Sequence, residues 1–124
     1  LAHVPVGRPF VEAMGEEEVM EHLQNQLEAG LTNVDPKKVV VAYEPAWAIS
    51  NGDPYKTKAV ENPDHAERIC MFIRIKFKVS KVLYGGSSDA SNAESFLQRQ
   101  IDGLLVGGAS LRPDEFNKMI TIKI

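Results

Sequence analysis

The sequence predicts an α/β fold in which parallel strands alternate with helices. One observation is a short, uncharged, β-branched run of the kind found in strands buried on both faces. A second is the helical spacing of apolar residues in the segments between such runs. A third is the repeat of strand and helix about every 20 to 40 residues, which is typical of right-handed βαβ units. The predicted strands lie near residues 10–14, 39–44, 81–84 and 103–106.

The chain opens with a segment that we interpret as a connector. Residues 1–9 contain the turn-forming Pro5 and Gly7 and precede the strand expected over residues 10–14. A helix is expected from Glu16, with acidic residues in its first turn and Gly30 at its end. Its apolar residues follow four-residue spacing: Val19, Leu23 and Leu27.

The strand over residues 39–44 carries a candidate catalytic residue. The carboxylate of Glu44 follows directly where the apolar run stops. Pro45 cannot donate a hydrogen bond to a neighbouring strand, so we expect the strand to end there. Active sites of parallel α/β proteins are built at this carboxyl end of the strands. The pattern therefore indicates a functional role for Glu44.

Residues 46–52 have the composition of a loop that moves. They contain the only tryptophan, Trp47, followed by the small residues Ala48, Ser50 and Gly52. A carboxylate on a rigid strand beside a mobile cover is typical of an enzyme that must exclude water from its reaction.

A second helix is expected from Asn62, which can cap it, with Pro63 at the first helical position and Asp64 near its positive end. The end of this segment also allows a strand, because apolar and basic residues alternate over residues 73–79. The strong cap and the βαβ order favour the helix. Its apolar face comprises Ala66, Ile69, Cys70, Ile73 and Phe77.

The C-terminal third contains two short strands that each end in a glycine pair. Residues 81–84 lead into Gly85–Gly86, and residues 103–106 lead into Gly107–Gly108. Between them, Ser91 and Glu94 are spaced as a capping box, which predicts a short helix there. A final helix is expected to begin near Pro113.

The glycine pairs have two interpretations. Glycine lets backbone N–H groups approach a ligand closely, and several such amides form a cradle for an anion. The same residues also make tight turns without any ligand. The residues alone leave both interpretations open.

Composition excludes several classes of function. The 124 residues are 44% hydrophobic and 25% charged, with a net charge of −3, as in an ordinary soluble domain. The basic residues between Arg74 and Lys81 are more typical of a solvated face than of a nucleic-acid-binding surface. No apolar run reaches the ~18 residues of a membrane span. Cys70 is the only cysteine, so we expect no internal disulfide and a reducing, cytoplasmic location, with no nucleic-acid or membrane partner.

Three motifs resemble the triosephosphate isomerase family. Its motif A-Y-E-P-x-W-A-I-G-x-G matches this chain at Ala42, Tyr43, Glu44, Pro45, Trp47, Ala48, Ile49 and Gly52. The segments from Tyr84 to Ser87 and from Asp102 to Leu111 are similar to its seventh-strand and eighth-strand motifs. The resemblance covers about residues 10–120 and implies that residues 10–124 form about half of a (β/α)8 TIM barrel, whose complete form needs roughly 250 residues.

The resemblance implies an isomerase that interconverts dihydroxyacetone phosphate and glyceraldehyde 3-phosphate without a cofactor or metal. Glu44 would move a proton between the two carbons through an enediolate. The substrate phosphate would be held by Ser50, Ser87, Gly107 and Gly108. The lid and its hinge would comprise Pro45, Ala46, Trp47, Ala48, Ile49 and Gly52, with Tyr84 and Ser87 bonding the closed lid and Glu16 accepting from the Trp47 indole. Ser50 departs from the family, which has glycine there.

Part of the family's catalytic machinery has no counterpart in this sequence. The family takes an asparagine and a lysine from its first strand and a histidine from its fourth, and His3, His22 and His65 fit no such motif. We therefore expect a C-terminal part of the enzyme that needs a complementary N-terminal half-barrel or a homo-oligomeric partner, the family being homodimeric. The alternative is a non-catalytic, self-associating half-barrel that keeps a phosphate-binding site.

Overall fold

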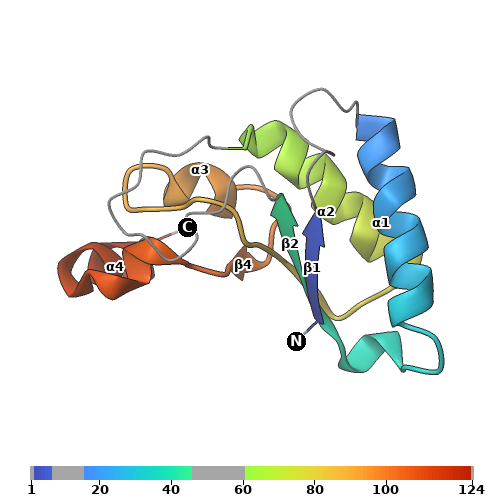
Figure 1. Ribbon diagram of the computed structural model, residues 1–124. Helices are drawn as coiled ribbons and strands as arrows, with labels where there is room; N and C mark the ends of the chain where they lie inside the picture. The colour runs from blue at the N-terminus through green and yellow to red at the C-terminus, as the bar shows by residue number, and fades with distance from the viewer. Residues whose placement is uncertain (1, 7–15, 46–60, 124) are drawn as a thin grey trace.

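The computed structural model describes residues 2–6, 16–45 and 61–123, and these form one parallel sheet with helices (Figure 1). The strands are β1 (Ala2–Val6), β2 (Val40–Pro45), β3 (Lys81–Tyr84) and β4 (Gly103–Leu104). They lie in the order β1-β2-β3-β4, and every neighbouring pair is parallel. The helices are α1 (Glu16–Gly30), α2 (Pro63–Phe77), α3 (Ala93–Leu97) and α4 (Pro113–Ile120). This arrangement confirms the predicted α/β class and is consistent with a partial barrel.

The interpretation of residues 1–9 as a connector was wrong. Residues 2–6 form β1, which pairs with β2 from Ala2 opposite Val41 to Val6 opposite Pro45. The β-branched Val4 and Val6 favour a strand, and β1 lies at the edge of the described sheet, where a proline such as Pro5 is tolerated. The strand expected over residues 10–14 lies outside the described residues.

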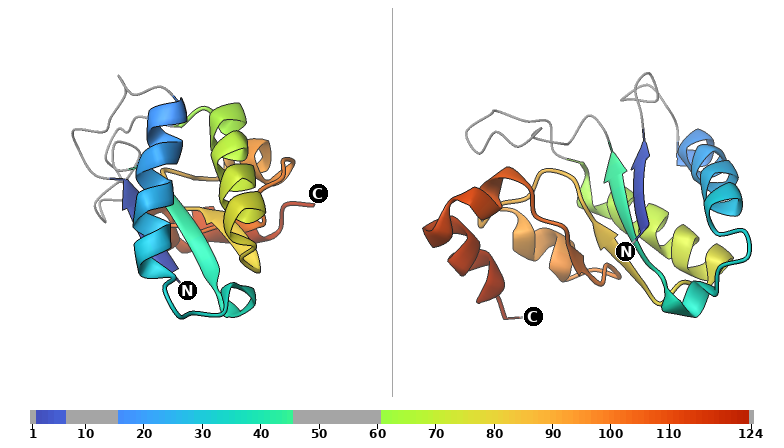
Figure 2. Two further views of the ribbon diagram at one scale, coloured as in Figure 1. Left: turned by 90° about the vertical axis from the view of Figure 1, so that its right-hand side faces the viewer. Right: turned by 60° about the horizontal axis from the view of Figure 1, so that its bottom comes forward.

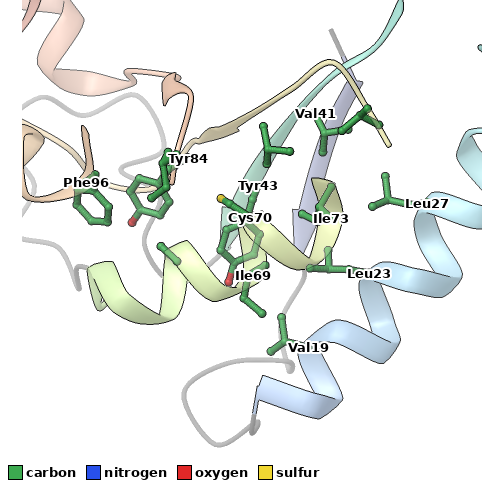
Figure 3. Close-up of a cluster of buried hydrophobic side chains, with 14 residues drawn as sticks. Val19, Leu23, Leu27, Val41, Tyr43, Ile69, Cys70, Ile73, Tyr84 and Phe96 are labelled. Carbon is green, nitrogen blue, oxygen red and sulfur yellow. The ribbon is translucent and has the colours of Figure 1, made fainter. Parts of the chain in front are cut away.

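Helices α1 and α2 pack side by side against one face of the sheet (Figure 2). Figure 3 shows the core that they form, with Leu23 of α1 and Ile73 of α2 pointing toward Val41 of β2. All three side chains are fully buried. The four-residue spacing of α1 was therefore the correct signal for its buried face.

The segment that allowed two interpretations is helical from Pro63 to Phe77. The Asn62 side chain caps it by accepting hydrogen bonds from the backbone N–H of Asp64 at 2.8 Å and of His65 at 3.4 Å. The strand alternative was wrong, since Ile75 is 69% exposed while Ile73 is buried. Lys78 caps the C-terminus of the helix, and its φ of 55° lies in the left-handed region.

The elements after β3 match the predicted order but differ in detail. The strand predicted over residues 103–106 is shorter, although Leu105 N–H donates to Tyr84 O at 2.8 Å beyond its end. The predicted capping box was wrong, because the Ser91 hydroxyl donates to the Asp89 carboxylate at 2.5 Å and leaves α3 to begin after Asn92. Helix α4 begins at Pro113 as expected.

Candidate functional site

The carboxyl ends of β2, β3 and β4 lie at the same end of the sheet, since the three strands are parallel neighbours. Predicted site residues lie at these strand ends or in the loops that follow them: Glu44 within the end of β2, Ser87 after β3, and Gly107 with Gly108 after β4. The fold thus brings three segments that are far apart in the sequence to the same end of the sheet.

Glu44 lies at the penultimate position of β2 and is 9% exposed. Its side chain extends across Gly85, the first residue after β3. A Cβ atom at Gly85 would lie 2.4 Å from Glu44 Cγ, closer than real Cβ contacts occur, and 3.0 Å from Oε1. The Gly85 N–H also donates to Tyr43 O at 2.8 Å, which ties the two strand ends together. The nearly buried Glu44 side chain therefore packs against the backbone of Gly85, which has no side chain of its own.

Gly86 gives Tyr84 the same kind of room. A Cβ atom at Gly86 would lie 2.1 Å from the Tyr84 hydroxyl oxygen. The Tyr84 ring is fully buried and stacks on Phe96 at a centroid distance of 4.2 Å (Figure 3). Neither Gly85 nor Gly86 has a φ in the left-handed region that favours glycine. The sequence interpretations of this glycine pair, an anion cradle or a tight turn, therefore missed a third reason, which is space for Glu44 and Tyr84.

The Tyr84 hydroxyl is buried and makes no well-formed hydrogen bond to the described residues. Burial raises the pKa of its phenol, and the charge of Glu61 raises it further, while a backbone group of Glu61 acts in the opposite direction.

The residues predicted to hold phosphate occupy loops on neighbouring strands. Ser87 is 4% exposed, and its carbonyl oxygen accepts from Asn92 Nδ2 at 3.4 Å. Gly108 is buried and opens a short 3₁₀ helix, Gly108–Leu111. Gly107 precedes this helix and accepts from the Ser110 hydroxyl at 2.6 Å.

Several predicted lid residues lie outside the described part of the chain: Ala46, Trp47, Ala48, Ile49, Ser50 and Gly52. Glu16, expected to accept from the Trp47 indole, accepts from Arg68 Nε at 2.7 Å and 2.9 Å through its two oxygens. The hydrogen bond from Arg68 is the main cause that lowers the pKa of Glu16, although burial opposes it.

A buried polar cluster beside β2 was missed by sequence reasoning. Glu61 is 5% exposed and accepts from the Tyr43 hydroxyl at 3.1 Å and from Asn62 N–H at 3.0 Å. Its Oε1 atom also lies 2.8 Å from His65 Nδ1. Burial and the neighbouring Glu61 raise the pKa of the Tyr43 phenol. His65, which fits no catalytic motif in the sequence, has a side chain that is only 16% exposed. The only sequence signal was an acidic residue next to the Asn62 cap.

Among the described residues, no group of three or more histidine, cysteine or acidic side chains could hold a metal ion. No helix in that part of the chain is both long enough and apolar enough to cross a membrane. Cys70 is buried, and burial raises the pKa of its thiol to about 12.

Comparison with known proteins identifies one family. The family model described as triosephosphate isomerase matches residues 8–123. The triosephosphate isomerase of Mesomycoplasma hyorhinis is 45% identical over 113 residues, which cover 90% of this chain and 43% of that protein. The triosephosphate isomerase of Trichodesmium erythraeum is 41% identical over 106 residues, covering 83% of this chain and 42% of the relative.

A solved structure has the same fold. The crystal structure of triosephosphate isomerase from Bartonella henselae superimposes with a TM-score of 0.67 at 26% identity. The match covers 97% of this chain and 48% of that one. The chain thus spans less than half the length of the relatives that it matches.

Proposed function

The chain belongs to the triosephosphate isomerase family, and from this premise we propose that it forms the C-terminal part of an isomerase acting on triose phosphates. The reaction interconverts dihydroxyacetone phosphate and glyceraldehyde 3-phosphate. The observation that carries this proposal is Glu44, a 9%-exposed carboxylate at the carboxyl end of a buried parallel strand, inside the motif that the chain shares with the family.

Glu44 is the general base in this proposal. A glutamate in water has a pKa near ~4.3, which makes it a weak base toward carbon unless its site is closed and dry. Its position across Gly85 supports the assignment, because the missing Cβ leaves room for the carboxylate beside the strand end. Glu44 would take a proton from one substrate carbon and return it to the neighbouring carbon, with an enediolate as the intermediate.

The substrate phosphate would be bound by backbone amides of the loops after β3 and β4, at Ser87, Gly107 and Gly108. The adjacency of these two strands supports the proposal, since the same pair of loops binds phosphate in many proteins of this fold class. The amide of Ser50 would complete the site from residues outside the described part of the chain.

Tyr84 and Ser87 would bond the closed lid, in which Ala48, Ile49 and Gly52 follow an N-terminal hinge formed by Pro45, Ala46 and Trp47. The buried Tyr84 hydroxyl supports this role, because it makes no well-formed hydrogen bond to the described residues. Glu16 would accept from the Trp47 indole, in addition to its ion pair with Arg68.

A second part of the barrel must supply the residues that polarise the substrate carbonyl. The lysine, asparagine and histidine that the family uses have no counterpart here, and each such donor contributes ~10²-fold or more. His65 cannot serve as the electrophile from its present place, because it is bonded through Glu61 to Tyr43, whose side chain lies on the opposite face of β2 from Glu44. The second part would be a complementary N-terminal half-barrel, in the cytoplasm. Another copy of the chain could pair with the open sheet but would lack the same three residues.

The test is an isomerisation assay on the purified chain, alone and mixed with the N-terminal part of the M. hyorhinis relative. Activity is expected in the mixture and should fall at least about 10³-fold in Glu44→Gln. Glu21→Gln, which changes an exposed carboxylate on α1, is the matched control and should leave the rate unchanged. Phosphate binding without turnover in any mixture would favour the non-catalytic half-barrel instead.

A further inference from the structure

Glu61 is a buried carboxylate with three hydrogen-bond partners. The Tyr43 hydroxyl lies 3.1 Å from Oε2, while Asn62 N–H and His65 Nδ1 lie 3.0 Å and 2.8 Å from Oε1. Burying a carboxylate is costly unless donors replace its hydration. The three donors replace the water that the carboxylate loses on burial, and they therefore offset the free-energy cost of burying it.

The donors connect two elements of the fold. Tyr43 belongs to β2, whereas Asn62 and His65 cap and open α2. The Asn62 side chain in turn accepts from the N–H groups of Asp64 and His65, so Glu61 is attached to a helix end that is itself well capped. Glu61 therefore links the carboxyl end of β2 to the rigid N-terminus of α2.

The end of β2 is paired with a neighbouring strand on one side only. Its pairing with β3 stops at Tyr43 opposite Tyr84. Its pairing with β1 continues, but Pro5 lies opposite Glu44 and Pro45 lies opposite Val6. Pro45 has no N–H, so the chain cannot donate from this position toward the β3 side. Beyond Gly85 N–H on Tyr43 O, this strand end is paired with β1 but not with β3, so a side-chain contact adds a restraint there.

Tyr43 and Glu44 are consecutive in the strand, so their side chains leave opposite faces. The Tyr43 ring lies in the core between the sheet and α2, near Ile69 and Cys70 (Figure 3). Glu44 lies against Gly85. A restraint on the Tyr43 side chain consequently limits the movement of the backbone from which Glu44 extends.

We propose that Glu61 is a positioning residue whose carboxylate holds Tyr43 against α2 and thereby fixes the orientation of Glu44. This inference rests on the proposed role of Glu44 as the base. It assigns to Glu61 no contact with the substrate.

The test measures backbone amide hydrogen exchange by NMR in the purified protein and in its variants, and it compares the exchange rates of two amides. Glu61→Gln keeps the shape of the side chain but lacks one acceptor oxygen, and Ile73→Val, in the core of α2, provides a variant of similar overall destabilisation. We expect Glu61→Gln to speed exchange of the Gly85 amide about tenfold, the factor expected when a hydrogen bond to a charged group is weakened. The Leu31 amide, which donates to Leu27 O in α1, serves as the internal reference. Ile73→Val should change both amides alike, and Glu21→Gln neither.

Two readouts separate this inference from the proposed function. In protein that is active, Glu61→Gln and Tyr43→Phe should lower kcat about tenfold and leave KM unchanged, since substrate binding does not involve either residue. Equal exchange of the Gly85 and Leu31 amides in Glu61→Gln would overturn the inference, whether or not the protein is an isomerase. Faster Gly85 exchange with an unchanged kcat would overturn the link to Glu44. Loss of the proposed function alone would appear as activity that is insensitive to Glu44→Gln.

Discussion

Two glycines after β3 are required for the space that they leave to other side chains. Gly85 accommodates Glu44 and Gly86 accommodates Tyr84, and neither has a backbone conformation that only glycine adopts. The usual argument for glycine at a strand end, close approach of amides to a ligand, is therefore incomplete here. The position of the proposed base depends on a residue that has no side chain at all.

Gly85→Ala should displace Glu44 and lower isomerase activity, because the new Cβ would lie 2.4 Å from Glu44 Cγ. Overpacking of this kind costs about 1–3 kcal/mol of stability. Gly30→Ala at the end of α1 is the matched control, since a Cβ there meets nothing within 4 Å. Thermal unfolding and the rate of isomerisation measure both effects. Equal behaviour of the two variants would contradict the close packing of Glu44 on Gly85.

The N-terminus of helix α2 lies beside the end of β2. Asn62 caps this helix end, and Glu61 connects it to β2 through Tyr43. Asn62→Ala should destabilise the fold by about 1 kcal/mol, the usual cost of removing a side-chain cap. Asn62→Asp should restore most of that stability, because its carboxylate accepts the same backbone N–H groups. Chemical denaturation provides the measurement. A destabilised Asn62→Asp variant would show that the cap hydrogen bonds are not what stabilises the helix start.

Asp102 directly precedes β4 and bonds to two other elements. Its Oδ2 accepts from Val82 N–H in β3 at 2.7 Å and from Arg74 Nη2 in α2 at 2.7 Å. Burial alone would raise the pKa of this carboxyl, but the Val82 amide and the Arg74 guanidinium outweigh it and lower the pKa below its ordinary value of 3.8. The folded state therefore favours the ionised carboxylate.

Stability should accordingly depend on pH through Asp102. A carboxyl with a lowered folded-state pKa contributes stability above its unfolded pKa, and this contribution is lost as the pH falls through the folded value. Asp102→Asn should be less stable than the natural chain by about 1 kcal/mol at pH 7, with the difference shrinking below about pH 4. Denaturation curves across this range test it. A difference that stays constant down to pH 2 would contradict the charged interaction.

Much of the architecture could be predicted because its local signals are strong. The four-residue spacing of α1, the Asn62–Pro63 start of α2 and the apolar run of β2 each indicate one structure in isolation. The position of Glu44 at the end of β2 also follows from local sequence. These elements can be predicted from the sequence because their local conformational preferences agree with the final fold.

Other features depend on contacts that the sequence does not display. Strand β1 was missed because Pro5 resembles a turn signal until the edge position of the strand is known. The capping box failed because Asp89 competes for the Ser91 hydroxyl. The cluster around Glu61 joins Tyr43 to a residue 18 positions later, and no periodicity marks such a pair.

The described sheet ends in two outer strands, β1 and β4, each paired on one side only. Open strand edges promote association with other chains. We expect the isolated chain to sediment as a species larger than its mass of 13.7 kDa, and the N-terminal part of a relative to convert it to a smaller, defined complex. Analytical ultracentrifugation tests this expectation. A stable, folded monomer would contradict the view that the chain is half of a closed barrel.

The central claim, that Glu44 moves a proton between substrate carbons, is tested most directly by isomerisation in D₂O followed by NMR of the product. Exchange of the proton on the Glu44 carboxylate with solvent would place deuterium on carbon in the product. The complemented chain should show this label, the Glu21→Gln control should match it, and Glu44→Gln should form neither product nor label. Isomerisation and labelling that persist in Glu44→Gln would contradict the claim.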